Sequence, residues 1–557
     1  MKITYPPWTE SLDLEALRNQ FGSPLWLVDH NQLTENLRTL TVFTESTEQV
    51  LYPVKANPSP AVLHLLATAG AGADCASPQE VDLALLAGIP YRHIVFNAPF
   101  QEKDYCLRLL AEGATVVLDD PAAIRAVATV AGELPGKTWL RINPVLDTSY
   151  ERSDKNQELM AHGGASSKFG VPEENIAGLL AASQIRFDGL HLHVGTQMDN
   201  LQTFRNALAK LHRWAGQLRA WGHPVKDLDI GGGLGIAFAP GQSFPSLSDW
   251  ADTLRPLRVE GYRYFTEPGH ALVGNAVSLL VTLLTKKDSR QRSWGIVDAG
   301  TDQLAKVTLL HWPHTVLDKH HRPLPFDGDD ALAGPLCFAG DTLLPHTDLS
   351  DISPGDPLLV TNAGAYTFAL SNNFNGRTMP AWVVLQGSHA SLHTHPEQPY
   401  NRIFLQQHRW GFVPPLTPHP ALPDIPTPPL QSGYLSRDIR HDQYSFSYFR
   451  QVGDRHYRFS ADIQSAVPFV SMPLAIRVMG DAAIVATLHT MEQPYKDVPV
   501  WGKKLEMEYK GRINSREPLE ADLFLSAVAK DAKGHARLCA YFETTDGKLT
   551  GALVVYL

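Results

Sequence analysis

A regular alternation of short apolar segments and longer helical stretches, between residues 24 and 268, constrains the fold more than any other feature. Each apolar segment is followed by a turn and then by residues with helical periodicity. This alternation predicts parallel strands covered by helices, and eight repeats close such a sheet into a barrel. There are nine extended pieces, and the sequence does not say which one lies outside the barrel. They are residues 24–28, 50–55, 71–75, 93–97, 115–118, 138–142, 187–194, 226–230 and 263–266.

The segments around this alternation predict three further parts of an α/β chain. After Pro268, β-rich segments with Gly and Pro turns continue to about residue 405. We therefore predict a (β/α)8 TIM-type barrel over 24–268 and an antiparallel β domain built from 1–23 and 269–405. Eight prolines between positions 414 and 429 favour an extended spacer, so residues 406–432 are predicted to be a linker. Residues 433–557 are predicted to form a separate C-terminal α+β domain.

The C-terminal domain shows one apolar stretch, 469–491, between strand-like segments. Strands are predicted at 444–448, 456–463, 504–509, 520–529, 535–544 and 548–556, the last two joined by the hairpin signal Thr545-Asp546-Gly547. A long helix wrapped by an antiparallel sheet resembles the hotdog fold of acyl-thioester enzymes. The resemblance implies either a thioesterase or a docking and dimerisation module. No nucleophile stands out, since Asp481, His489, Glu492 and Asp497 are more simply explained as solvated or capping residues.

Charge and cysteine content narrow the classes of function. The formal net charge is −10, which offers no basic footprint for nucleic acid or an anionic membrane, so a small-molecule ligand is expected. The four cysteines lack paired spacing, which argues against a disulfide framework and a structural zinc site. No apolar run approaches the ~20 residues that span a bilayer, and residues 1–7 lack a signal-peptide core. A cytoplasmic, soluble protein is expected.

Four polar or glycine-rich features follow predicted strands. Lys55 lies at the carboxyl end of the segment 50–56, where a barrel presents its chemistry, although a lone lysine there is usually a surface residue. Gly231 to Gly235 end another strand with bare amides that suit a phosphate, or form an ordinary turn. His193 ends a third strand, where an imidazole can lie flat on an aromatic ring or be simply half-buried. Glu267 precedes a Pro-Gly turn and is either a ring-nitrogen partner or a solvated loop residue.

Together these segments resemble the fold-type III decarboxylases that use pyridoxal 5′-phosphate, the group of diaminopimelate and ornithine decarboxylases, which share their barrel with alanine racemase. The matching motifs fall in the family's order and cover roughly residues 20 to 390. They are Tyr52-Pro53-Val54-Lys55-Ala56-Asn57, Asp74-Cys75-Ala76-Ser77, Arg141-Ile142-Asn143-Pro144, Ser167-Lys168-Phe169-Gly170, His193 with residues 195–197, Gly231-Gly232-Gly233, Glu267-Pro268-Gly269, residues 334–341, Gly364-Ala365-Tyr366 and Phe374-Asn375-Gly376.

The resemblance implies a role for each matching position. Lys55 holds the cofactor aldehyde as a Schiff base, and Glu267 keeps the pyridine nitrogen protonated. His193 stacks on the ring, and Cys337, delivered from the other subunit, reprotonates Cα. An obligate homodimer with shared active sites follows, acting on a small amino acid. The remaining cofactor-binding residues are Asp74, Arg141, Thr196, Gly232, Gly233, Gly269, His270 and Tyr366, of which Thr196, the two glycines and Tyr366 hold the phosphate.

Departures from the family's pattern bear on the phosphate and the substrate. His270 stands where the family usually has a phosphate-binding arginine, and it is a weaker, pH-sensitive donor. Phe338 stands where diamine-forming members carry an acid that pairs with the substrate's distal ammonium, and it is assigned with Asp341 to substrate binding. The segment from Lys306 to Leu310 lacks the family's Arg and Tyr. We therefore hypothesise an apolar, large or carrier-tethered amino-acid substrate rather than ornithine, lysine or diaminopimelate.

Two competing functions and one alternative ligand remain. A racemase of this barrel normally places arginine opposite the ring nitrogen, where this chain has Glu267. A non-catalytic cofactor-binding protein would usually lack Cys337 and the β domain. His389, His393 and His395 suggest a metal, but no carboxylate or thiol cluster accompanies them, so they are expected to be solvated loop residues and no metal site is predicted.

Overall fold

The structure is a computed structural model of the 557-residue chain. It describes residues 5–129, 131–145, 167–396, 443–453, 455–464, 470, 472–490, 501–509, 513–526, 529–530 and 536–556. The chain divides into two compact units, Met1–Glu397 and Gln398–Leu557, and each is treated by itself below. The predicted linker, 406–432, lies outside the described residues. No helix in the described part of the chain is long and apolar enough to cross a membrane.

The first unit contains a near-closed parallel barrel, as the alternation predicts. Its strands, hydrogen-bonded in chain order, are β2 (Leu51–Pro53), β3 (Gly72–Cys75), β4 (Ile94–Phe96), β5 (Thr115–Leu118), β6 (Lys137–Asn143), β8 (Gly189–His191), β9 (Asp227–Asp229) and β10 (Arg263–Phe265). A parallel bridge between Val50 and Thr266 joins the first strand to the last. A short additional strand, β7 (Val171–Pro172), pairs with β6.

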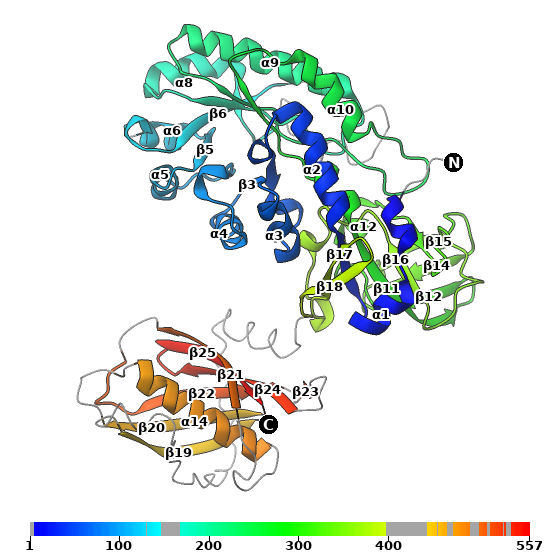
Figure 1. The fold of residues 1–557 in the computed structure, drawn as a ribbon, viewed down its shortest axis with the longest axis vertical. Helices are drawn as coiled ribbons and strands as arrows, with labels where there is room; N and C mark the ends of the chain where they lie inside the picture. The colour runs from blue at the N-terminus through cyan, green and yellow to red at the C-terminus, as the bar shows by residue number, and fades with distance from the viewer. Residues whose placement is uncertain are drawn as a thin grey trace. The chain divides into compact units, whose positions relative to one another are not determined.

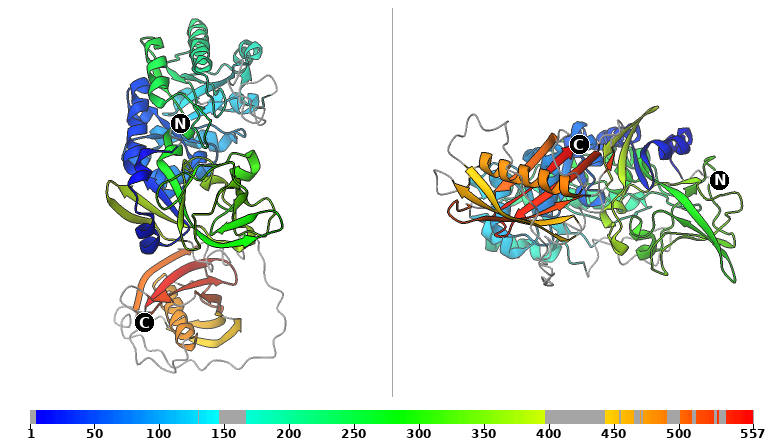
Figure 2. Two further views of the ribbon diagram at one scale, coloured as in Figure 1. Left: turned by 90° about the vertical axis from the view of Figure 1, so that its right-hand side faces the viewer. Right: turned by 90° about the horizontal axis from the view of Figure 1, so that it is seen from below.

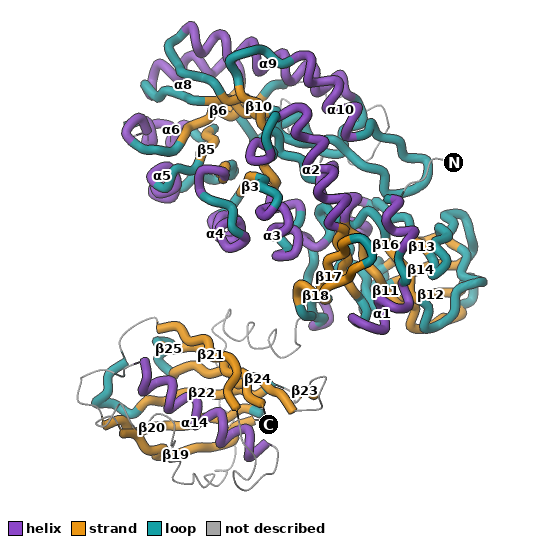
Figure 3. Tube along the Cα trace, in the orientation of Figure 1, coloured by secondary structure: helices purple, strands orange, loops and turns teal. Residues whose placement is uncertain are grey.

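Helices surround these strands on the outside (Figures 1 and 3). They are α2 (His30–Thr44), α3 (Pro60–Thr68), α4 (Pro78–Ala87), α5 (Lys103–Ala111), α6 (Pro121–Ala128), α8 (Ile176–Ser183), α9 (Leu201–Ala220) and α10 (Leu247–Leu254). Several begin at a side chain that accepts a backbone N–H, such as Asp29, Ser77 and Asp120. Alternate strand residues form a separate buried cluster and fill the barrel's interior. This cluster is Leu51, Val95, Val117, Trp139 and Phe265.

A second, mostly antiparallel sheet accompanies the barrel. It consists of β1 (Leu25–Asp29), β11 (Val277–Asp288), β12 (Ser293–Val297), β13 (Val316–Leu317), β14 (Asp330–Ala333), β15 (Thr342–Thr347), β16 (Pro357–Val360), β17 (Ala381–Gln386) and β18 (His389–Thr394). Two of its strand pairs, β1 with β17 and β12 with β14, are parallel. Three short helices accompany it, α1 (Leu14–Phe21), α11 (His270–Val273) and α12 (Ala305–Leu310).

The ninth extended piece of the sequence, residues 24–28, is β1 and lies in this second sheet. It pairs antiparallel with β11 and parallel with β17, so the predicted barrel boundary at residue 24 is wrong by one strand. The physical reason is that β1 is buried along its whole length and precedes helix α2, which packs against α10 of the barrel layer. A buried apolar strand followed by a helix has the same pattern in either sheet.

The second unit is an antiparallel sheet with one long helix. The strands are β19 (Gln443–Gly453), β20 (His456–Gln464), β21 (Trp501–Tyr509), β22 (Leu519–Leu525), β23 (Ala529–Lys530), β24 (Ala536–Thr544) and β25 (Leu549–Tyr556), in the order β19-β20-β22-β24-β25-β21, with β23 beside β24. Helix α14 (Met472–Thr490) packs against β20, β22 and β25 (Figure 2). Buried residues of the helix and of the sheet form one core of their own, separate from that of the first unit.

Candidate active site

Lys55 lies at the carboxyl end of a barrel strand, on the turn of 3-10 helix (Val54–Ala56) that follows β2. Its Nζ is 2.7 Å from Oδ2 of Asp74, which stands on the adjacent strand β3. The lysine side chain is 39% exposed, whereas that of Asp74 is fully buried. A buried carboxylate therefore holds an amine that is still open to a ligand.

The charges around this pair change the pKa values of both groups. Burial lowers the pKa of Lys55, but the carboxylates of Asp74 and Glu267 outweigh it and raise the pKa above its ordinary value. Burial and the charge of Glu267 raise the pKa of Asp74 to about 7. In this structure Lys55 is therefore an ammonium group near two carboxyl groups.

Five polar residues at the ends of barrel strands form what we call the strand-end cluster. They are Asn97 after β4, Arg141 in β6, His191 in β8, Asp229 in β9 and Glu267 after β10. All are buried. Because parallel strands end at one edge of the barrel, these side chains meet beside Lys55. The cluster places opposite charges and hydrogen-bonding groups where barrel enzymes bind ligands.

Hydrogen bonds within the cluster fix the direction of each group. Arg141 Nη1 donates to Asn97 Oδ1 at 2.9 Å, so the Asn97 Nδ2 is a donor and lies 3.5 Å from Glu267 Oε1. His191 Nε2 lies 3.2 Å from the same oxygen. Burial raises the pKa of Glu267, but the His191 contact and the charge of Lys55 outweigh it and hold the pKa below its ordinary value. Glu267 Oε2 is buried and has no hydrogen-bond partner among the described residues.

A second group of residues forms a cradle beside the cluster. The cradle consists of Thr196, Gly232, Gly233, Gly269, His270 and Tyr366. A Cβ atom at Gly232 would collide with the Glu267 carbonyl oxygen, and Gly233 has a φ of +116°. Thr196 Oγ1 lies 3.3 Å from His270 Nδ1, and the His270 and Tyr366 rings are 4.8 Å apart between centroids. Close backbone approach and several donors suit an anion such as a phosphate group.

In the sequence, His193 stands between His191 of the cluster and Thr196 of the cradle. It is half-buried, and its Nδ1 accepts a hydrogen bond from the Gly195 backbone N–H at 3.1 Å. The sequence predicts a strand that ends at residue 194, but β8 ends at His191. His193 is therefore a residue of the following loop, and the Gly195 bond orients its ring.

The loop between β14 and β15 carries three of the predicted residues. Cys337 is exposed, and its backbone N–H donates to Asn375 Oδ1 at 2.9 Å. The Phe338 side chain is 49% exposed. Asp341, by contrast, is buried and accepts hydrogen bonds from the Thr301 and Leu336 backbone N–H groups at 2.7 and 2.9 Å. Asp341 therefore holds the loop in shape, a role that the assignment to substrate binding did not anticipate.

Helix α12 carries Lys306, the first residue of the segment that was noted above for lacking Arg and Tyr. Lys306 is completely buried, and its Nζ donates to the Ala365 carbonyl oxygen at 2.9 Å. The same nitrogen lies 4.0 Å from the centre of the Phe238 ring, a cation–π distance. Burial lowers the pKa of this amine well below its ordinary value. Lys306 is thus engaged with the protein's own backbone and an aromatic ring.

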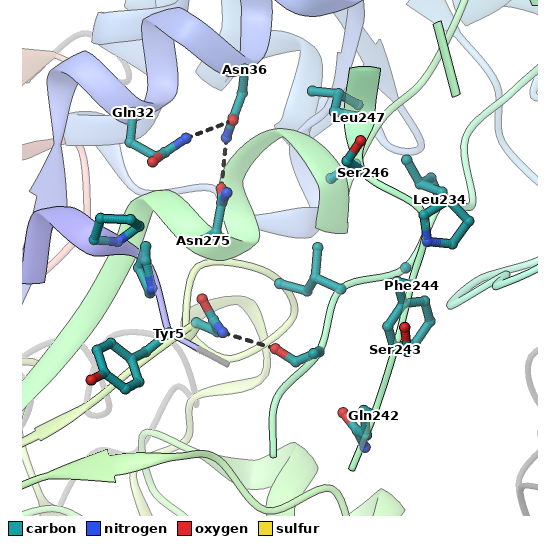
Figure 4. Close-up of a pocket in the computed structure, with 18 residues that line it drawn as sticks. Tyr5, Gln32, Asn36, Leu234, Gln242, Ser243, Phe244, Ser246, Leu247 and Asn275 are labelled. Atoms are coloured by element: carbon teal, nitrogen blue, oxygen red, sulfur yellow. Dashed lines mark hydrogen bonds between the residues drawn. The ribbon is translucent and has the colours of Figure 1, made fainter. Parts of the chain in front are cut away.

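A pocket of about 400 Å³ lies behind the glycine run, and Figure 4 shows its lining. Leu234 and residues after it form one wall. The other wall contains three side-chain amides linked by hydrogen bonds. Gln32 Nε2 donates to Asn36 Oδ1 at 2.9 Å, and Asn36 Nδ2 donates to Asn275 Oδ1 at 2.6 Å. None of the predicted site residues lines this pocket, so it is distinct from the cluster and the cradle.

The histidines that suggested a metal do not form a ligand group in the described part of the chain. His389 and His393 are exposed residues of strand β18, rather than of the loop that the sequence predicts, and His395 follows that strand. Of the tail candidates, Asp481 accepts a hydrogen bond from the Tyr444 hydroxyl, and His489 Nδ1 lies 3.0 Å from the Tyr457 hydroxyl. Residues 492 and 497 lie outside the described residues.

Sequence reasoning missed three members of the strand-end cluster, namely Asn97, His191 and Asp229. Each is a polar residue at or just after the last position of an otherwise apolar strand, which is the one available signal. Such residues also cap turns, so the signal alone does not separate a site from a strand end. Their proximity to one another becomes visible only when the barrel closes.

The described residues fit pyridoxal 5′-phosphate. Lys55 offers an amine, the cradle offers backbone amides and hydroxyls for a phosphate, and Glu267 offers a buried oxygen that has no donor. A pyridine nitrogen that carries a proton would supply that donor. The fit therefore rests on three separate observations, one each for the cofactor's aldehyde, its phosphate group and its ring nitrogen.

Comparisons with known proteins agree with this fit. Residues 31–274 match the model of the pyridoxal-dependent decarboxylase family's pyridoxal-binding domain. The chain is 31% identical over 398 residues to diaminopimelate decarboxylase of Aquifex aeolicus, covering 69% of this chain and 91% of that protein. It is 29% identical over 399 residues to the Zymomonas mobilis diaminopimelate decarboxylase, covering 69% and 92%.

Solved structures show the same likeness in three dimensions. A crystal structure from Aquifex aeolicus matches with a TM-score of 0.62 and 27% identity, covering 71% of this chain and 94% of that one. Diaminopimelate decarboxylase from Helicobacter pylori complexed with L-lysine matches with a TM-score of 0.63 and 24% identity, covering 71% and 99%. The fold of the first unit is that of the alanine racemase and decarboxylase type.

These findings decide between the reactions that the sequence left open. The cofactor is pyridoxal 5′-phosphate and the reaction class is decarboxylation of an amino acid, so racemisation and cofactor binding alone have no support. The chain belongs to the family of pyridoxal-dependent amino-acid decarboxylases.

Proposed function

We propose that this enzyme uses Lys55 to hold its cofactor and decarboxylates an amino acid whose side chain carries no distal ammonium. The observation that carries the proposal is Phe338, a half-exposed aromatic residue where an acid would be needed to pair with such an ammonium. When bound, pyridoxal 5′-phosphate supplies an electron sink for the charge left at Cα. The protein residues bind and orient the reactants and manage protons.

Lys55, Asp74 and Glu267 act on the reacting end of the site in this proposal. Asp74 holds the Lys55 amine at 2.7 Å and so orients it toward the cofactor aldehyde. Glu267 stays ionised, because its pKa is held low, and keeps a proton on the ring nitrogen. His193 would stack on the ring of the bound cofactor, and Arg141 fixes the Asn97 amide that contacts Glu267.

The cradle residues hold the phosphate end. Gly232 and Gly233 present backbone amides, and the Thr196 and Tyr366 hydroxyls add donors, with Gly269 leaving room for the Tyr366 ring. His270 adds a donor where an arginine is usual, so we expect phosphate affinity to depend more on the glycine amides than it does in relatives with arginine.

Cys337 acts in the partner's active site in this proposal, where it returns a proton to Cα, and the enzyme is a homodimer. Cys337 is exposed, and Phe338 beside it and Phe374, next to its Asn375 partner, are each 49% exposed. Exposed aromatic side chains close together favour an interface. A second copy of the chain would cover them.

Mixing two inactive variants tests the shared site. Lys55→Ala and Cys337→Ala are each expected to be nearly inactive alone. Because half of randomly reassembled dimers are mixed and each mixed dimer has one complete site, the mixture should recover about a quarter of wild-type activity. No recovery, with both variants folded and exchanging subunits, would remove the shared-site proposal.

The substrate assignment also draws on Lys306. Its amine is engaged by the Ala365 carbonyl and the Phe238 ring, so it is not free to bind a group of the substrate. A distal ammonium buried beside Phe338 without a counter-charge would cost several kcal/mol, roughly 3–5 by analogy with broken buried pairs. An apolar, large or carrier-tethered amino acid avoids that cost.

Carbon dioxide release across a panel of amino acids tests this assignment. We expect wild type to favour an amino acid without a distal ammonium over lysine, ornithine and diaminopimelate. The variant Phe338→Asp should raise kcat/KM for the ammonium-bearing substrates by about tenfold, since a charge partner is restored. High wild-type activity on lysine or diaminopimelate would contradict the assignment.

Diaminopimelate is the second candidate substrate, and the names of the Aquifex and Zymomonas relatives favour it. The same panel separates the two candidates. If diaminopimelate is the substrate, Phe338→Asp should leave its kcat/KM unchanged or lower it, because another group already binds the distal ammonium.

The C-terminal unit is proposed to be a hotdog-like module for thioester chemistry or docking. Support comes from its strand order and from a single helix packed on one antiparallel sheet. Incubating the full-length enzyme with a panel of acyl-CoA and carrier thioesters tests catalysis. Hydrolysis that Asp481→Asn or His489→Ala abolishes would favour a thioesterase, whereas inactivity across the panel would favour docking of a carrier-bound substrate.

A further inference from the structure

Asp229 places a second carboxyl group directly against Glu267. It ends strand β9 and is completely buried. Ligand atoms of Asp229, Glu267 and His191 lie within 4.8 Å of one another. Like charges at such a distance in a buried site repel strongly, so two ionised carboxylates there are unfavourable. One of the two groups must therefore carry a proton or face a cation.

The hydrogen bonds show which oxygen lacks a partner. Asp229 Oδ1 accepts from the Gly231 backbone N–H at 2.8 Å, but Oδ2 is buried and has no partner among the described residues. Glu267 Oε1 has the Asn97 amide and the His191 imidazole beside it. A proton on Asp229 would give Oδ2 an acceptor in Glu267 and would remove the repulsion at once.

The neighbours of Glu267 favour the charge on that residue. The charge of Lys55 acts on Glu267, and Glu267 also contacts the Asn97 amide and the His191 imidazole. The pKa of Asp229 is raised well above its ordinary value by burial and by the charge of Glu267. Asp74 raises it further, and the pKa of Glu267 is lowered. The pKa shifts of Asp229 and Glu267 are therefore opposite in direction, although the two carboxyl groups lie in one cluster.

We propose that Asp229 is a neutral carboxylic acid that donates a hydrogen bond to the Glu267 carboxylate and positions it to face the cofactor's ring nitrogen. Asp229 touches neither substrate nor cofactor in this role, so it is a positioning residue. The proposal rests on the function assigned above to Glu267. It makes Glu267 a single, oriented anion, held by Asp229, His191 and Asn97.

The same strand supplies a matched control. Asp227, two residues earlier on β9, is also buried, but Arg263 Nε and Lys137 Nζ donate to it at 2.8 and 3.0 Å. Asp227 is therefore paired with two cations, while Asp229 is paired with an anion. A method that detects protonated carboxyl groups should distinguish the two.

Infrared spectroscopy of the cofactor-free enzyme tests the protonation state directly. At about pH 8.5, above the Asp74 pKa of about 7, the wild type should show a carboxylic-acid C=O stretch that Asp229→Asn removes and Asp227→Asn leaves in place. Absence of the band in the folded wild type, or its survival in Asp229→Asn, would overturn the proposal. Because no cofactor is present, this result does not depend on the proposed function.

Cofactor binding to the variants tests the positioning. Asn retains a donor and Leu does not, so Asp229→Asn should keep the wild-type cofactor absorbance across the pH range and a Kd within about threefold. Asp229→Leu should weaken binding about tenfold, the value of one lost hydrogen bond to a charged group, and change the spectrum. Equal Kd values and equal absorbance spectra for the two variants would overturn the proposal. If Asp229→Leu does not fold, a cofactor absorbance spectrum of Asp229→Asn that differs from wild type would overturn it. Failure of the wild type itself to bind cofactor would instead refute the proposed function.

Discussion

At the scale of single residues, the site depends on how buried charges are paired. Asp74 holds Lys55, while Glu267 is held by Asn97 and His191 and stands near Asp229. These contacts keep three carboxyl groups, those of Asp74, Asp229 and Glu267, in a buried site where desolvation disfavours their ionised forms. Protonation of one or more of them relieves that strain, and pH is therefore a direct probe of the site.

Asp74 should make the cofactor-free enzyme less stable as pH rises. Its pKa of about 7 in the folded state lies above its value of 3.8 in the absence of burial, so between those values the folded protein binds the additional proton. The free energy of unfolding then falls as pH rises through that window, and the contribution of this proton is lost above about pH 7. Urea unfolding of cofactor-free wild type and Asp74→Asn from pH 4 to 8 measures this pH dependence. The transition to follow is that of the first unit, which is identified separately as the one that added cofactor stabilises. The variant should show a flatter pH dependence, and equal slopes would contradict the assignment.

At the scale of strands, helices and loops, the cradle requires close contact between backbone segments. Gly232→Ala should lower the stability of the first unit by about 1–3 kcal/mol and weaken cofactor binding, because its Cβ would collide with the Glu267 carbonyl oxygen. Thermal unfolding with and without cofactor measures both effects.

Gly216 provides the control for that substitution. It is an exposed residue of helix α9 with open space where a Cβ would lie. Gly216→Ala should therefore raise stability by about 0.5–1 kcal/mol and leave cofactor binding unchanged. If both glycine variants behave alike, crowding at Gly232 is not the cause.

The sequence predicts strands and strand ends well, because alternating apolar segments and helix caps are local features. Lys55, Glu267 and the glycine run stand at predicted strand ends, but it was their resemblance to a known family's motifs that singled them out. Whether a strand belongs to one sheet or another depends on distant partners, which explains why the sequence did not decide which extended piece lies outside the barrel and why the predicted boundary at residue 24 included β1. Asn97 and Asp229 were missed for the same reason, since only the closed barrel brings them together.

At the scale of the whole molecule, two units with separate cores form one chain. The contacts between Lys55, the strand-end cluster and the cradle all lie within the first unit. The second unit has its own helix and sheet, so its proposed role concerns the substrate's carrier rather than the bond that breaks. Each unit should therefore respond differently to cofactor.

Calorimetry of the full-length enzyme should show two unfolding transitions. Pyridoxal 5′-phosphate at 100 times its Kd should raise only one of them, by a stabilisation of about 2.7 kcal/mol, since a ligand stabilises the unit that binds it. Lys55→Ala should reduce that shift. A single transition that moves as a whole would show that the two units unfold together.

The central claim is that the cofactor is bonded to the amine of Lys55. Borohydride reduction of the enzyme with pyridoxal 5′-phosphate, followed by mass spectrometry of its peptides, tests this claim most directly. We predict that the peptide containing Lys55 gains the mass of one reduced phosphopyridoxyl group, and that the label is absent from Lys55→Ala. An unmodified Lys55 peptide, or a label on another lysine such as Lys306, would contradict the account.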